Sequence, residues 1–346
     1  NQTKKWVEKY FGEIKRGEAI PKMEKQSLTL TETKKLYYED NFARLPQLTL
    51  TWPSVYEYHP DSYALEVLAS YISKGKKAPL YKTLVEDKKL TDQIDVFQYN
   101  SELAGQFMLS VTAFDKTHLD DVMNGVNEAF KNFEAKGISQ QDLNRIKAGQ
   151  ETAFYTKLSS VLGKGFQLAQ YEIFAGNPDF IEQDVKNILA VTTADVMRIY
   201  QKYVKGKHFV ATSFVPKGEA TLALKGSTLA KVVEEKIVEG KEDAFDATIA
   251  ATYEKTPSSF DRSIEPAYGE SPDVKLPTVW KNKLSSGINL IGIENHEVPL
   301  VQFLFQIKGG MLLENTSKIG VSNMLAELMT KGTKNKTPEQ LENAIE

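Results

Sequence analysis

Residues 21–218 switch repeatedly between two hydrophobic periods, and this switching limits the possible folds more than any other feature of the sequence. Leu45–Val55 alternates apolar and polar residues, as a half-buried strand does. Shortly after it, Asp61 is placed to cap a helix with an apolar face at helical spacing. That face is formed by Leu65, Leu68, Ala69 and Ile72. The sequence therefore predicts a strand followed by a helix that packs against it.

The same change of period recurs through this region. Further strands are predicted at Gln93–Tyr99, Gln106–Phe114 and His208–Val215. Helices are predicted at Leu80–Val85, Leu119–Phe133, Gln140–Leu162, Phe166–Phe174 and Ala194–Tyr203, the last of them capped by Thr193. Elements in this order favour an α+β fold, in which an antiparallel-rich sheet is covered by helices on one face.

Four segments are predicted along the chain. Residues 1–20 carry one apolar helix face and are interpreted as the last helix of a missing upstream unit. Residues 21–218 form the self-consistent domain described above. Residues 219–277, rich in Lys, Glu, Gly, Pro and Ser, are predicted to be a linker. Residues 278–346 are predicted to be the truncated start of a second unit.

The second unit is expected to open with a hairpin. Leu284–Ile293 and Val298–Ile307 have the apolar content of two strands, with a turn at Glu294–Glu297. Near the C-terminus, Pro338 lies in the first turn of a helix that has run only a few residues when the chain stops. We therefore expect this unit to be incomplete.

Composition restricts the function. The chain has 346 residues, no cysteine and four histidines, so no disulfide or thiolate chemistry is available. Its net charge of −3 gives no basic field that would gather nucleic acid. No apolar run is long enough to span a membrane, and no targeting signal opens the chain. The cytoplasm and a bacterial periplasm are both compatible with the sequence, and the periplasm is slightly preferred.

Several segments resemble the pitrilysin-type zinc peptidases, the family of insulin-degrading enzyme and the mitochondrial processing peptidase. The opening of the family's metal unit is similar to Leu284–Leu290, Lys308–Glu314 and the stretch from Gly320 to Lys331-Gly332-Thr333. The family's non-catalytic companion unit is similar to Pro79–Glu86 and Thr192–Val196. The resemblance implies a companion domain at 21–218 and a degenerate metal unit at 278–346.

The metal helix is the position that decides between an active and an inactive unit. Active members carry His-x-x-Glu-His, which places two imidazoles on one helix face and a Glu that polarises zinc-bound water. Here Asn323, Ala326 and Glu327 stand at those three places. The four histidines are isolated from one another in sequence. They are His59, His118, His208 and His296. We expect no metal and no catalytic residue in this chain, and zinc in the upstream part of the full protein.

Lys164 and Tyr171 are candidate substrate contacts, because companion units of the family supply basic and aromatic groups that hold the peptide backbone. The alternative for this pair, and the one we favour, is a solvated Lys and a half-buried Tyr. His296, with Glu294 and Glu297, is interpreted as a solvated turn rather than a metal cluster.

Two functions follow from the resemblance. The first is a non-catalytic portion of a zinc metalloendopeptidase, which forms the chamber wall and a substrate-holding surface. Its partners are a peptide substrate and an upstream catalytic half or a partner peptidase subunit. The second is an inactive partner or scaffold subunit that complements an active peptidase chain. Whether the intact protein is an enzyme is left open by the sequence of this chain.

Overall fold

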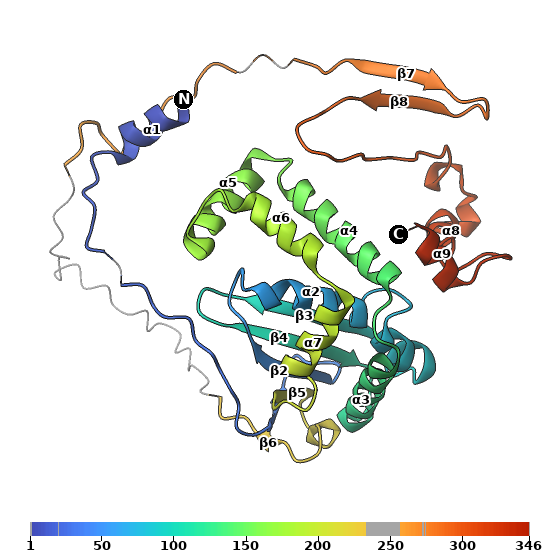
Figure 1. Ribbon diagram of the computed structural model, residues 1–346. Helices are drawn as coiled ribbons and strands as arrows, with labels where there is room; N and C mark the ends of the chain where they lie inside the picture. The colour runs from blue at the N-terminus through green and yellow to red at the C-terminus, as the bar shows by residue number, and fades with distance from the viewer. Residues whose placement is uncertain (1, 20, 233–256, 272, 274, 346) are drawn as a thin grey trace, which may run out of the picture. The chain divides into compact units, whose positions relative to one another are not determined.

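The chain is described by a computed structural model that covers residues 2–19, 21–232, 257–271, 273 and 275–345. It divides into two compact units. One unit joins Asn1–Met23 to Val232–Asn295, and the other joins Glu24–Lys231 to His296–Glu346. The larger unit contains the main sheet and the helices that cover it (Figure 1).

The main sheet has six strands in the order β3-β4-β2-β5-β1-β6. The strands are β1 (Lys34–Asp40), β2 (Gln47–Ser54), β3 (Thr91–Asn100), β4 (Gly105–Ala113), β5 (Val210–Pro216) and β6 (Thr228–Leu229). The pairs β3–β4, β4–β2 and β2–β5 are antiparallel, whereas β1 is parallel to both of its neighbours. The predicted α+β class with an antiparallel-rich sheet is confirmed.

The two faces of this sheet differ in polarity. Leu50 of β2 lies opposite Leu109 of β4 and Ala211 of β5, and all three side chains are fully buried. On the other face, the hydroxyl groups of Thr49 and Ser110 form a hydrogen bond of 3.1 Å across the same two strands. This alternation is the period of two that the sequence shows, with apolar residues inward and polar residues outward.

Helices cover the apolar face (Figure 1). They are α2 (Pro60–Ser73), α3 (Leu119–Lys136), α4 (Gln140–Lys157), α5 (Val161–Gln170), α6 (Ile181–Ala190) and α7 (Thr193–Tyr203). The first layer consists of α2, α3 and α7, which contact the strands, while α4 and α6 pack on α2. Two π-helical turns, η1 (Tyr81–Asp87) and η2 (Tyr171–Ala175), lie next to these helices. The turn η1 contacts α3, and η2 continues α5.

Several predicted helix boundaries are wrong by one to five residues. The N-cap of α2 is His59, whose Nδ1 accepts a hydrogen bond from the Asp61 amide, so Asp61 is not the cap. The N-cap of α7 is Thr192 rather than Thr193, and it forms a capping box with Asp195. The predicted helix Gln140–Leu162 ends at Lys157, because a second helix begins after the Ser160 cap.

Strand β1 and helix α6 are among the elements that the sequence did not predict. The strand β1 reads KKLYYED, and its side chains are half-buried on both faces, so it lacks the alternation that identifies a strand. The helix α6 follows Gly176-Asn177-Pro178, a sequence typical of a loop.

The C-terminal part of the chain contains short elements only. These are η3 (Ala220–Leu222), η4 (Met311–Leu313), η5 (Thr316–Lys318), α8 (Val321–Leu328) and α9 (Pro338–Ile345). Within the larger unit, Lys82 pairs with Glu339 at 2.8 Å, and the Lys76 amide donates to Glu342 at 2.7 Å. These contacts connect α9 to the loop after α2.

The smaller unit contains α1 (Gln2–Phe11) and a hairpin of β7 (Val279–Lys283) and β8 (Asn289–Ile293). The hairpin turns at Leu284–Ile288, not at Glu294–Glu297 as predicted, because Gly287 adopts φ 89°, a conformation that suits a tight turn. The expected second strand, Val298–Ile307, is irregular.

The predicted linker at 219–277 lies partly outside the described residues, and its described part includes η3 and β6. The four segment boundaries therefore stay predictions. Among the residues that the structure covers, no helix is both long enough and apolar enough to cross a membrane.

The burial of one sheet face predicts that substitutions at two positions of β4 change the free energy of unfolding by very different amounts. Leu109→Ala should lower the free energy of unfolding by ~2–5 kcal/mol, because it leaves a cavity between β4 and the helices. Gln106→Ala, at an exposed position of the same strand, should change it by less than ~0.5 kcal/mol. Urea unfolding followed by circular dichroism measures both. Equal effects would show that this face is not the core.

Candidate functional site

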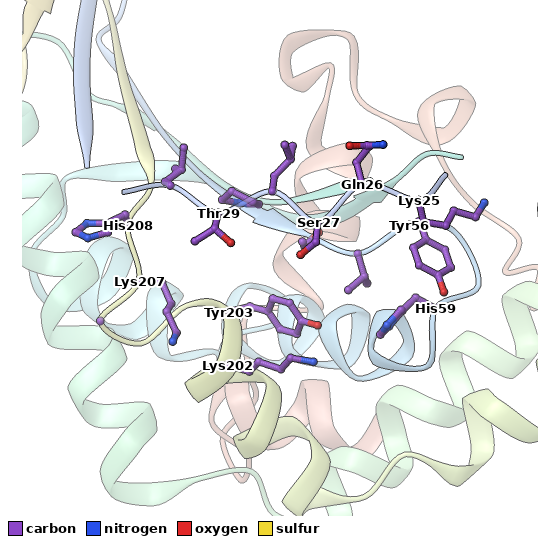
Figure 2. A pocket seen from close by; sticks show the side chains of 16 residues that line it. Lys25, Gln26, Ser27, Thr29, Tyr56, His59, Lys202, Tyr203, Lys207 and His208 are labelled. Carbon is purple, nitrogen blue, oxygen red and sulfur yellow. The ribbon is translucent and has the colours of Figure 1, made fainter. Parts of the chain in front are cut away.

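A pocket opens at one end of the central strands, and we call it the strand-end pocket. It lies between residues 25–30, the end of β2 with the following loop to His59, and the end of α7 with residues 206–208. Its volume is about 600 Å³. Figure 2 shows Gln26, Ser27 and Thr29 on one side of this space and Lys202, Tyr203 and Lys207 on the other. The volume is typical of a site for a small molecule or a short peptide segment.

The charged lining of the strand-end pocket is basic. It contains Lys25, Lys202 and Lys207, and no Asp or Glu is among its lining residues. The Lys25 ammonium donates to the backbone oxygen of Glu102 at 2.7 Å and lies 5.0 Å from the centre of the Tyr56 ring. The Lys207 side chain has no hydrogen-bond or ion-pair partner within the described part of the chain. The pocket therefore presents uncompensated positive charge.

Asp61 lies behind one wall of the pocket, in the first turn of α2, and is 5% exposed. Its carboxylate accepts hydrogen bonds from Arg198 at 2.8 Å, Lys202 at 2.7 Å and the Tyr203 hydroxyl at 2.7 Å. Burial alone would raise the pKa of Asp61, but these three donors outweigh it and hold the pKa well below the usual range. Asp61 thus compensates Lys202 and fixes the end of α7 against α2.

His59 forms the corner of the pocket next to Tyr56, with the two rings edge-to-face at 5.1 Å. Its Nδ1 accepts the Asp61 amide, so a neutral ring carries its proton on Nε2. Burial lowers the pKa of His59, which keeps the ring neutral near pH 7. His208 also lines the pocket, although the two histidines are far apart in sequence.

Tyr171 is fully buried, more deeply than expected from the sequence. Its hydroxyl donates to Asp184 of α6 at 2.7 Å, and Tyr63 of α2 donates to the other oxygen of the same carboxylate at 2.7 Å. Asp184 is itself 7% exposed. This network joins α2, η2 and α6, and it gives Tyr171 a structural role in the described chain.

Lys164 is exposed on α5 and pairs with Glu297 of the same unit. It does not share a surface with Tyr171, because the Tyr171 ring points into the core. Their role as substrate contacts stays a prediction. Lys164 is the one of the two that a ligand can reach in this arrangement.

The three positions that the resemblance aligns with the metal motif lie on α8. Asn323, Ala326 and Glu327 are all exposed. They offer one amide, one methyl group and one carboxylate, which is not a ligand set for Zn²⁺. Met324, Leu325 and Leu328 are also exposed, at 64%, 59% and 56%. Within the described residues this helix contacts the short turn η4, and its apolar side chains stay largely exposed.

Glu314, the acidic residue that precedes the metal helix in the resemblance, has a capping role. Its carboxylate accepts the amides of Gly320 at 2.7 Å and Ser322 at 2.5 Å, at the start of α8. These bonds lower the pKa of Glu314. The negative charge suits the positive end of the helix.

Histidines and carboxylates do not assemble into a metal site in the described residues, where no group of three or more could hold an ion. His118 contacts the backbone oxygen of Thr221 at 3.2 Å, and His208 contacts the Thr33 hydroxyl at 3.3 Å. The structure therefore does not fit a resident zinc ion in this part of the protein.

The comparison with protein families agrees with this geometry. Residues 1–150 match the family described as "Peptidase M16 inactive domain". Less than half of the chain, residues 1–150, is thus similar to a peptidase M16 inactive domain. This finding confirms the resemblance to the pitrilysin-type family and the assignment to its non-catalytic portion. A search of curated proteins finds no match.

Solved structures share the fold of this chain. A protease from Helicobacter pylori aligns with a TM-score of 0.56 and 19% identity, over 62% of this chain and 53% of that one. The periplasmic protease PqqL from Escherichia coli aligns with a TM-score of 0.51 and 16% identity, over 62% of this chain and 24% of that one. The chain thus spans about half of the first structure and about a quarter of the second.

Sequence reasoning did not identify the strand-end pocket. Its lining comes from three segments that are distant in sequence, and only the basic run Lys202, Lys205, Lys207 signals it. The predicted contacts, in contrast, came from the family resemblance.

The hydrogen-bond network around Asp184 predicts that substitutions at Tyr171 and at Lys164 differ in their effect on stability. Tyr171→Phe should lower the free energy of unfolding by ~1.5–3 kcal/mol, because Asp184 loses a buried donor. Lys164→Ala removes an exposed ion pair and should cost ~0–1 kcal/mol. Chemical denaturation of both variants against the parent tests this. A stable Tyr171→Phe variant would contradict the structural role.

Asp61 predicts a pH dependence. Because its folded pKa is depressed, its stabilising effect is complete above the unfolded value of about 3.9 and is lost as the pH falls toward the folded value. At pH 7, Asp61→Asn should lower the free energy of unfolding by ~1–3 kcal/mol. This difference should shrink when urea unfolding is repeated near pH 3. Asp95→Asn, at an exposed position of β3, is the control and should have little effect at either pH.

Metal analysis tests whether the chain lacks a zinc site. The chain, loaded with zinc and then dialysed, should retain no stoichiometric zinc, because the described residues contain no group of three or more side chains that could hold a metal ion and the sequence has no cysteine. One tightly bound zinc ion per chain would overturn the assignment.

Proposed function

We propose that the chain provides chamber wall and a substrate-holding surface for peptide hydrolysis by a zinc metalloendopeptidase of the M16 type. The observation that carries the proposal is the match of residues 1–150 to an M16 inactive domain, in a well-packed chain whose described residues hold no ligand set for zinc. A domain of this kind contributes binding surface rather than bond cleavage.

Zinc belongs to a different part of the assembly in this proposal. The family resemblance implies an upstream catalytic unit, on the same chain or on a partner subunit, where zinc activates the attacking water. The residues of the present chain do not take part in that step.

Contact with such a catalytic unit is supported by an apolar surface on α5. Val161, Leu162 and Phe166 are 87%, 71% and 62% exposed, and they lie within six residues of one another. Neighbouring exposed apolar side chains of this size are typical of protein contacts. We propose that α5 belongs to the surface that meets the catalytic unit.

A periplasmic location is part of the same proposal. It is supported by the fold shared with the periplasmic protease from Escherichia coli. A composition without cysteine is compatible with the periplasm and with the cytoplasm alike.

Peptide binding without cleavage is the expected behaviour of the purified chain. Fluorescence anisotropy with labelled unstructured peptides should show saturable binding, while a quenched peptide should stay intact with or without added zinc. Lys164→Ala should weaken binding if α5 contributes a substrate contact. Failure to bind any peptide would contradict the proposal, and so would chelator-sensitive cleavage.

A further inference from the structure

We propose that the strand-end pocket binds the carboxylate of a peptide, through Lys25 and Lys207, with the adjoining peptide segment in the same cavity. This inference rests on the proposed peptide-holding role and adds to it a defined place and a defined chemical group.

The charge balance of the strand-end pocket selects an anion. Of its three lysines, Lys202 is compensated by Asp61 at 2.7 Å. Lys25 donates only to a backbone oxygen and lies over the Tyr56 ring, and Lys207 has no partner among the described residues. No acidic side chain lines the cavity. Two positive charges therefore remain for a ligand, at the mouth of a cavity that no acidic side chain lines.

Uncharged hydrogen-bond donors in the strand-end pocket also favour an anionic ligand. The Nε2–H of neutral His59 is not used by the bond that its Nδ1 accepts from the Asp61 amide. The hydroxyl groups of Ser27 and Thr29 lie along the facing segment (Figure 2). Hydrogen bonds from such groups to a carboxylate are charge-assisted and shorter than neutral ones.

The remaining lining favours a peptide rather than a free inorganic anion. Leu28, Val55 and Tyr56 supply apolar surface beside the lysines, and a volume of about 600 Å³ far exceeds that of one small anion. The pocket contains no arginine, which would offer the bidentate fork that phosphate recognition favours. A carboxylate attached to a short chain matches both the charged and the apolar part.

The carboxylate has two sources in a peptide, the C-terminus and an acidic side chain, and three labelled peptides distinguish them. The first has neutral side chains and a free C-terminus, the second has the same sequence with a C-terminal amide, and the third is the amide with one internal Glu. Binding to the full chain is measured by fluorescence anisotropy in low salt. The variants are Lys25→Ala/Lys207→Ala and, as a control with equal charge change, Lys131→Ala/Lys136→Ala on the exposed side of α3.

At least one carboxylate peptide should bind tenfold or more tightly than the neutral amide. The Lys25→Ala/Lys207→Ala variant should abolish this preference, whereas the α3 control should keep it. Preference for the free C-terminus or for internal Glu identifies the source. Equal binding of all three peptides, or an unchanged preference in the pocket variant, would overturn the inference and leave the peptide-holding role intact. Absence of all peptide binding would instead refute the proposed function, and the inference with it.

Discussion

Burial of one sheet face beneath helices is the constraint on which the rest of this structure depends. Leu48, Leu50 and Trp52 of β2 point to that face, and β4 and β5 place their own apolar side chains beside them in register. A slip of one residue would turn every one of these side chains to the polar face. The fixed register also fixes where β2 ends and β5 begins, and the strand-end pocket opens between those two points.

Two buried carboxylates hold the helices in place above this face. Asp61 connects α2 to the end of α7, while Asp184 connects α6 to Tyr63 of α2 and to Tyr171 of η2. A buried carboxylate is costly unless donors surround it, so each one stabilises only the helix arrangement that supplies those donors. The helix that lines the pocket is therefore positioned by charge as well as by apolar packing.

The sequence predicted those parts of the fold that rest on local pattern. Strands β2, β3, β4 and β5 and the core residues Leu65, Leu68 and Ile72 follow from hydrophobic period, and the burial of these residues agrees. Strand β1 was missed because its side chains do not alternate, and its place depends on a distant partner. The strand-end pocket was missed for the same reason, since its walls meet only after folding. Asn323, Ala326 and Glu327 could be named from the family pattern, but the exposure of the flanking Met324 and Leu325 could not.

The parallel pairing of β1 with β5 has a consequence for the folding of the domain during its synthesis on the ribosome. β1 precedes the other strands of this sheet in the sequence, yet its partner β5 is made only after every helix from α2 to α7. Until then β1 has neither neighbour, because β6 follows β5 in the chain. The antiparallel group β2, β3 and β4 can form earlier from contacts close in sequence. During synthesis β1 therefore stays unpaired beside a partly formed sheet. The pairing of β1 with β5 completes the sheet, and until this step the exposed strand edges favour chaperone binding and aggregation.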